Sequence, residues 1–164
     1  MFDRELVLYA FNLHMCRTLA GDVPETDFDA RLPGSGNSPL WIVAHPAVAT
    51  DYAMKTLGRE PVIPRAWHEA YGIGSDAERP SASPPSKAAA LEALVAGHGR
   101  VEAALRETDA SQLDREHGLP HLQRIGLPLR TRRDVLSHLM ATHESFHIGQ
   151  LSAWRRQRGF KHLF

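Results

Sequence analysis

The segment from residue 131 to residue 158 constrains the fold most strongly, because its apolar and ring-bearing side chains recur at steps of four, three, four, three and four. This spacing is typical of a helix with one face buried against other helices. Thr131 and Asp134 have the spacing of a capping box, with Asp in place of the usual Glu or Gln, and Gly159 suits the position past a helix end. The sequence therefore predicts a long final helix from Thr131 to about Arg158. Its buried seam is predicted to be Leu136, Met140, His143, His147, Gln150 and Trp154.

Three earlier segments also show helical periodicity. Asp3 and Ser38 are suitable N-cap residues, and Pro39 fits the first position of a helix. Gly21 and Gly58 are suitable stops. The predicted helices run from about Asp3 to Ala20, from Ser38 to about Leu57, and from about Ser86 to Thr108.

Two long connections separate these helices. Residues 59–85 hold five of the 11 prolines, and their aromatic residues, among them Trp67 and Tyr71, indicate that the segment packs onto the helices. Residues 109–130 form the second connection. No alternating strand pattern competes, so we expect an all-α four-helix bundle that forms a single domain over residues 1–164, with long loops after its second and third helices.

Composition narrows the classes of function. Nineteen Lys and Arg balance nineteen Asp and Glu, so the net charge gives no support for a general nucleic-acid or membrane surface. Cys16 is the single cysteine, which rules out an internal disulfide and suits a reducing cytoplasm. It falls in the apolar pattern of the first helix, where an inert buried thiol is expected. We find neither a signal peptide nor an apolar stretch of about 20 residues, so we expect a cytoplasmic protein with no membrane partner.

The ten histidines are the unusual feature of the composition. His143 and His147 are four residues apart, on one face of the last helix, in a seam where Leu and Ile are expected. Leaving a buried polar group unpaired costs about 1–3 kcal/mol, and a metal ion resolves this by taking one nitrogen of each ring. Core histidines bonded to other side chains or to water are the alternative, which the paired spacing makes less favourable.

The string from His143 to His147 also matches the zinc-peptidase motif H-E-x-x-H, in which the glutamate is the general base. Gln150 and Ala153 stand where the extended motif requires Gly and His, and no Asp or Glu follows Glu144. A third ligand must therefore come from earlier in the chain. His138 lies about 140° around the helix from His143 and is a poor candidate. The earlier histidines are His14, His45, His68, His98, His117, His121 and His138, of which His45 and His98 fall in interior seams and stay open alternatives.

Two runs of residues stand out together. The first run is Asn37-Ser38-Pro39-Leu40-Trp41-Ile42-Val43-Ala44-His45 with Asp51-Tyr52, and the second contains Arg133, Val135, His138, His143, Glu144, His147, Gly149, Gln150 and Leu151. Both runs resemble a known family, the DinB-like (YfiT-like) superfamily. The resemblance implies a metal triad of His45, His143 and His147, with His98 as a core residue or a support for the ligands. It also implies a homodimer.

The expected chemistry follows from that triad. Three neutral histidines suit zinc or nickel, and also accept iron or manganese, while leaving one position open for water or a small-molecule substrate. The resemblance implies a transferase or isomerase that uses a low-molecular-weight thiol such as mycothiol or bacillithiol, and we favour a thiol-dependent S-transferase. The alternatives are a hydrolase with Glu144 or metal-bound water as the base, and a non-catalytic metal-binding stress-associated protein. Gln150 is expected to support a ligand or contact the substrate.

Pro46 follows His45 directly, inside the predicted second helix. Proline removes a backbone donor and disfavours helical geometry in the residue before it. We therefore expect a kink here, which either aims His45 inward or displaces it.

Overall fold

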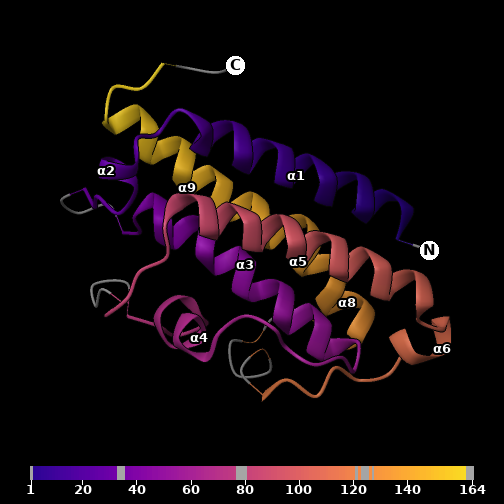
Figure 1. The fold of residues 1–164 in the computed structure, drawn as a ribbon. Helices are drawn as coiled ribbons and strands as arrows, with labels where there is room; N and C mark the ends of the chain where they lie inside the picture. The colour runs from indigo at the N-terminus through magenta and orange to yellow at the C-terminus, as the bar shows by residue number, and fades with distance from the viewer. Residues whose placement is uncertain are drawn as a thin grey trace.

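The computed structural model describes residues 2–32, 36–76, 81–120, 122, 126 and 128–161. Its long elements are α1 (Asp3–Gly21), α3 (Pro39–Thr56), α5 (Lys87–Glu107) and a final run made of α8 (Arg132–Ser137), the π-helical turn η1 (His138–His143) and α9 (Glu144–Gln157). Figure 1 shows α1 beside α9 and α3 beside α5, so the predicted all-α four-helix bundle is confirmed. Within the described ranges, an isolated antiparallel bridge between Glu116 and Thr131 is the single β-type pairing.

Three helix starts follow the sequence prediction. The Ser38 hydroxyl accepts a hydrogen bond from the Trp41 backbone N–H over 3.2 Å. Ser86 caps α5 in the same way, and Thr131 forms the predicted capping box with Asp134. The prediction for α1 is wrong by one residue, because its N-cap is Phe2, which has φ 63° and no side-chain cap, so Asp3 is already helical.

The predicted long connections contain short helices, α4 (Arg65–Tyr71) in the first and α6 (Ala110–Leu113) in the second. A further short helix, α2 (Glu25–Phe28), lies between α1 and α3. Tyr71 is buried, which confirms that the first connection packs onto the bundle. These helices are a turn or two long, so they leave too little periodicity to be found in the sequence.

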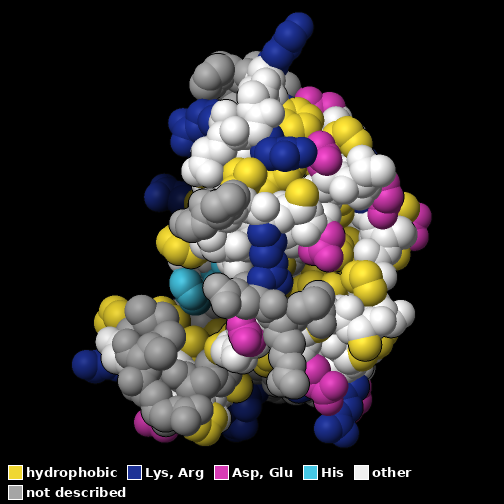
Figure 2. Space-filling view, turned by 90° about the vertical axis from the view of Figure 1, so that its left-hand side faces the viewer, with side chains coloured by type: hydrophobic (Ala, Val, Ile, Leu, Met, Phe, Trp, Pro, Cys, Tyr) yellow, Lys and Arg dark blue, Asp and Glu magenta, His cyan; other side chains and the backbone are white. Residues whose placement is uncertain are grey.

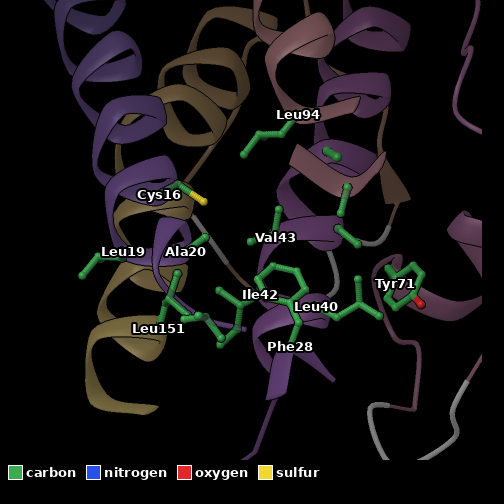
Figure 3. Close-up of a cluster of buried hydrophobic side chains, with 14 of the residues drawn as sticks. Cys16, Leu19, Ala20, Phe28, Leu40, Ile42, Val43, Tyr71, Leu94 and Leu151 are labelled. Carbon is green, nitrogen blue, oxygen red and sulfur yellow. The ribbon is translucent and has the colours of Figure 1, made fainter. Parts of the chain in front are cut away.

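Buried apolar side chains from all four long elements form the core. Figure 3 shows one cluster, in which Cys16 of α1, Ile42 of α3, Leu94 of α5 and Leu151 of α9 lie together. Burial raises the pKa of the Cys16 thiol to about 12, so the thiol stays protonated and inert. The second cluster lies around Tyr9, Met54, Val101, Leu105, Leu136 and Met140.

The π-helical turn changes which face of the last helix is buried. At 100° per residue, the mean direction of the buried side chains moves by about 80° between residues 135–140 and residues 144–155, which is nearly one residue. The predicted seam is therefore right at His147 and Trp154 and wrong at His143 and Gln150, which lie at the edge, while Glu144 lies inside. The buried residues are Val135, Leu136, Leu139 and Met140 before the change, and Glu144, His147, Leu151, Trp154 and Arg155 after it.

Asp51 fixes the first long connection to the bundle. Its carboxylate is fully buried on α3 and accepts hydrogen bonds from the backbone N–H groups of Val62 and Ile63. His68 and Arg100 also donate to it, over 3.0 and 3.1 Å. Because His68 belongs to α4, the buried carboxylate holds that short helix against α3, which matters for the site described below.

The outer surface is mixed in charge. Figure 2 shows Lys and Arg side chains interspersed with Asp and Glu on one end of the molecule. Of the helices that the structure describes, none combines the length and the apolar character needed to cross a membrane.

Candidate metal centre

Three histidines, one from α3 and two from the final helical run, meet near one edge of the core. His45 lies on α3, His143 ends η1 and His147 lies on α9. One ring nitrogen from each lies within 4.8 Å of the other two. His45 and His147 are buried, and His143 is partly buried. The structure thus brings together the three residues that the resemblance singled out.

His45 is fixed in one tautomer. Its Nδ1 lies 2.6 Å from the backbone carbonyl oxygen of Tyr71, so the Nδ1–H donates to that carbonyl and Nε2 is left bare. The ring stacks on Trp41 with 4.4 Å between the centroids and 11° between the planes. Burial, with the charge of His147, lowers the pKa of His45 to about 4, so the imidazole is neutral at pH 7. A neutral ring with a bare Nε2 is what a metal ligand needs.

His147 is held in the same way by an amide. Its Nδ1 lies 3.2 Å from Oε1 of Gln150, one turn further along α9. The same oxygen accepts a hydrogen bond from Nδ2 of Asn37 over 3.3 Å, which fixes the orientation of the amide. Burial lowers the pKa of His147. Gln150 therefore orients the ring and leaves its Nε2 for the centre.

His143, the last residue of η1, completes the cluster. Its Nε2 lies 3.1 Å from Nε2 of His45, and its buried Nδ1 has no hydrogen-bond partner among the described residues. Burial, together with His147, His45 and His138, lowers its pKa to about 2. Nitrogen ligands at 2.0–2.1 Å in a tetrahedral site stand about 3.3 Å apart, so the observed separation fits a shared metal ion.

Pro46 does not displace His45. The helix α3 runs without interruption from Pro39 to Thr56, and His45 points inward with 5% of its surface exposed. Pro46 instead borders a narrow cavity that Glu144 and His147 also line. Of the two outcomes that the sequence left open, inward orientation of His45 is the one observed.

Glu144 and His98 form a buried pair behind the cluster. Oε1 of Glu144 lies 2.8 Å from Nε2 of His98, and each residue is 5% exposed. Burial raises the pKa of Glu144 well above its usual range and lowers that of His98 to about 3. Both shifts favour a pair without net charge. The His98 ring stacks on Tyr9 with 3.5 Å between the centroids, so His98 serves the core and Glu144 rather than the histidine cluster.

Of the other described histidines, His138 lies beside the cluster, with 5.7 Å between its ring centroid and that of His143. His68 donates to Asp51, the ring of His117 bonds the backbone of Leu119 and Leu129, and His138 bonds Thr142. His121 and His162 lie outside the described residues. Sequence reasoning missed the Tyr71 carbonyl and Asn37, because every residue carries a carbonyl and a single Asn before a helix reads as a loop or cap residue.

The bundle and its histidine cluster define an all-α protein with a candidate three-histidine metal centre. The model of the DinB superfamily matches residues 9–151, and the chain belongs to that superfamily.

One solved structure with the same fold is that of YfiT from Bacillus subtilis, described as a probable metal-dependent hydrolase with an unusual four-helix bundle topology. The two chains superpose with a TM-score of 0.66 over 97% of this chain and 88% of YfiT, at 17% identity. At that identity the likeness concerns the fold. A comparison with curated protein sequences gives no match.

Proposed function

We propose that this chain binds one divalent transition-metal ion, zinc or nickel, through His45, His143 and His147, and uses it in catalysis. The observation that carries the proposal is the pair of fixed tautomers: Tyr71 and Gln150 each engage an Nδ1–H, so the bare Nε2 atoms converge with His143. A divalent ion at such a site supplies a Lewis acid and an open position at which water or a thiol loses its proton more easily.

The residues around the cluster support a small-molecule substrate. A pocket of about 260 Å³ adjoins Gln150, the residue that orients His147. Amide groups dominate its polar lining, so a bound molecule meets hydrogen-bond donors and acceptors without a fixed charge. The lining residues are Gly36, Asn37, Gln150, Ala153, Trp154 and Gln157.

We favour transfer to or from a low-molecular-weight thiol as the reaction. Three neutral imidazoles leave the full positive charge of the ion uncompensated, which favours an anionic thiolate as the added ligand. The chain's own Cys16 is unsuited as the nucleophile, because its thiol has a pKa of about 12. A thiol cosubstrate from solution therefore fits the site better than an internal cysteine.

Hydrolysis is the second candidate, favoured by the description of YfiT as a probable metal-dependent hydrolase. In that reaction Glu144 is the candidate base; it borders the same narrow cavity as His147, and it must first release the proton that burial favours. The variant Glu144→Gln separates the two reactions, because it keeps a hydrogen-bonding group for His98 but removes the base. Hydrolysis of ester or amide test substrates should collapse in the variant, whereas thiol transfer should largely survive.

The first experiment is elemental analysis of protein purified without a histidine tag. We expect about one equivalent of zinc or nickel per chain, and its loss in His45→Ala. The control is His14→Ala, which removes an exposed histidine of α1 and should leave the metal content unchanged. Absence of metal from the wild-type protein, or its retention in His45→Ala, would contradict the proposal.

Activity, assembly and location need tests of their own. Metal without turnover in either assay would favour a non-catalytic metal-binding, stress-associated protein. A homodimer, implied by the family resemblance, stays a prediction that sedimentation of the purified protein checks. The cytoplasmic location and the lack of a nucleic-acid partner also stay predictions.

A further inference from the structure

Asn12 is a buried amide on the apolar face of α1, between Tyr9 and Cys16. It is 3% exposed, and a polar side chain at such a position must find partners. Its Nδ2 donates to the backbone carbonyls of Met140 and Ala141, each over 3.0 Å. Both carbonyls belong to the π-helical turn η1, on the far side of the interface between α1 and the last helix.

Asn12 donates to both carbonyls from another helix, and that of Ala141 also accepts the backbone N–H of Glu144. A π-helical turn interrupts the regular ladder of backbone hydrogen bonds, and buried carbonyls must then be paired by other groups. The two N–H groups of Asn12 contribute to that pairing. Ser145 adds to it, because its hydroxyl lies 2.6 Å from the Ala141 carbonyl oxygen and 3.1 Å from Oδ1 of Asn12.

The widened turn decides where the metal ligands stand. It shifts the buried face of the last helix by nearly one residue, which places Glu144 inside the core beside His98. His143 and Gln150 come to the edge of that face, next to His45 and Asn37. If the turn relaxed to a regular α-helix, α9 would rotate against α8 by nearly 100° and the three rings would no longer converge.

We infer that Asn12 is a positioning residue of the metal centre: by pairing the carbonyls of η1 it maintains the widened turn that brings His143 and His147 to His45. This inference rests on the proposed function, because it concerns the geometry of the same site. Residues that orient metal ligands from outside the coordination sphere typically contribute 10–100-fold to metal affinity.

The test is a Co²⁺ titration of the untagged, metal-free protein and of Asn12→Leu, which is close in size and lacks both donors. We expect the Kd for Co²⁺ to rise by about 10–100-fold, the visible absorption bands of bound Co²⁺ to change shape, and backbone amides in residues 141–146 to exchange with deuterium faster. The control is Thr56→Val. Thr56 is also 3% exposed and also bonds a helix carbonyl, that of Tyr52, so its loss should leave the Co²⁺ affinity and spectrum unchanged.

Each outcome decides the inference. A folded Asn12→Leu protein with wild-type Co²⁺ affinity and spectrum would overturn it, as would an equal loss in Thr56→Val. Should Asn12→Leu not fold, Ser145→Ala on the exposed side of the turn decides: weaker Co²⁺ binding and faster exchange support the inference, and unchanged values overturn it. Failure of the wild-type protein to bind Co²⁺ would overturn the proposed function and the inference together.

Discussion

A Cβ atom built on Gly97 would stand 2.4 Å from Oγ1 of Thr50, so the Thr50 side chain of α3 fills the space that a side chain at position 97 of α5 would need. A Cβ atom built on the nearby Gly99 would have nothing within 4 Å. Two glycines on one helix thus differ in their reason for being there. The first permits contact between helices, and the second leaves the helix with an avoidable entropic cost.

We predict that Gly97→Ala lowers the free energy of unfolding by about 1–3 kcal/mol, although alanine is the better helix former. Gly99→Ala should raise it by about 0.5–1 kcal/mol. Urea unfolding of both variants measures the difference. Adding Thr50→Ala to Gly97→Ala should recover part of the loss, and equal behaviour of the two glycine variants would contradict the proposed close contact.

Gln150 is predicted to control metal affinity through His147. The variant Gln150→Leu leaves the Nδ1–H of His147 without its acceptor, so the ring loses its fixed orientation. The Kd for Zn²⁺, measured by competition with a chelating dye, should rise by about 10–100-fold. Gln157→Leu, which alters the same pocket two turns further along the chain, is the control and should bind Zn²⁺ normally.

The Glu144–His98 pair offers a prediction about stability. Replacing either residue by Leu leaves a buried polar partner unsatisfied, at a cost of about 1–3 kcal/mol. The double variant removes both polar groups and should be less destabilised than the sum of the single variants. Urea unfolding of the four proteins gives the coupling. Strict additivity would show that the 2.8 Å contact contributes nothing specific.

Because the Asp51 carboxylate is buried and hydrogen-bonded, we predict that the free energy of unfolding depends on pH. Burial raises its pKa, but hydrogen bonds from Val62 and Ile63, with those from His68 and Arg100, outweigh burial and lower the pKa below its usual range. A lowered folded-state pKa stabilises the protein above the unfolded value of about 3.9, and this contribution is lost as the pH falls through the folded value.

The variant Asp51→Asn should therefore be less stable than wild type by about 1–3 kcal/mol at pH 7, with the gap narrowing below about pH 4. Urea unfolding at pH 7, 5 and 3 measures the gap. The exposed Asp109, replaced by Asn, serves as the control and should unfold with nearly wild-type stability at pH 7. A gap that stays constant down to pH 3 would show that the carboxylate charge is not the source of the stability.

Local signals in the sequence predicted much of this fold. Ser38 and Thr131 were identifiable as caps because each acts on backbone groups two or three residues away, and the third helix begins at Ser86 as expected. The paired spacing of His143 and His147 identified two of the three candidate ligands for the same reason. The choice of His45 over His98 depended on the family resemblance, since both residues fall in buried seams.

The rest depends on contacts between distant parts of the chain. The slip of the buried face at η1 was not predicted, because it involves Asn12, more than a hundred residues away, and a helix with a widened turn keeps an almost regular apolar period. The role of the Tyr71 carbonyl was not predictable either. Tyr71 belongs to α4, and the Asp51 contacts that hold this region in place join residues 11 to 49 positions apart. Such contacts form in the folded chain and leave no periodic pattern in the sequence.

His45 and His143 are 98 positions apart, on different long helices. An ion held by both would close a loop of nearly a hundred residues, much as a disulfide does, and in the chain-entropy model a cross-link of that length restricts the unfolded chain by about 4–5 kcal/mol. The ion would then stabilise the folded chain as well as take part in the reaction. A shortage of the metal would therefore lower the free energy of unfolding of the protein as well as its activity.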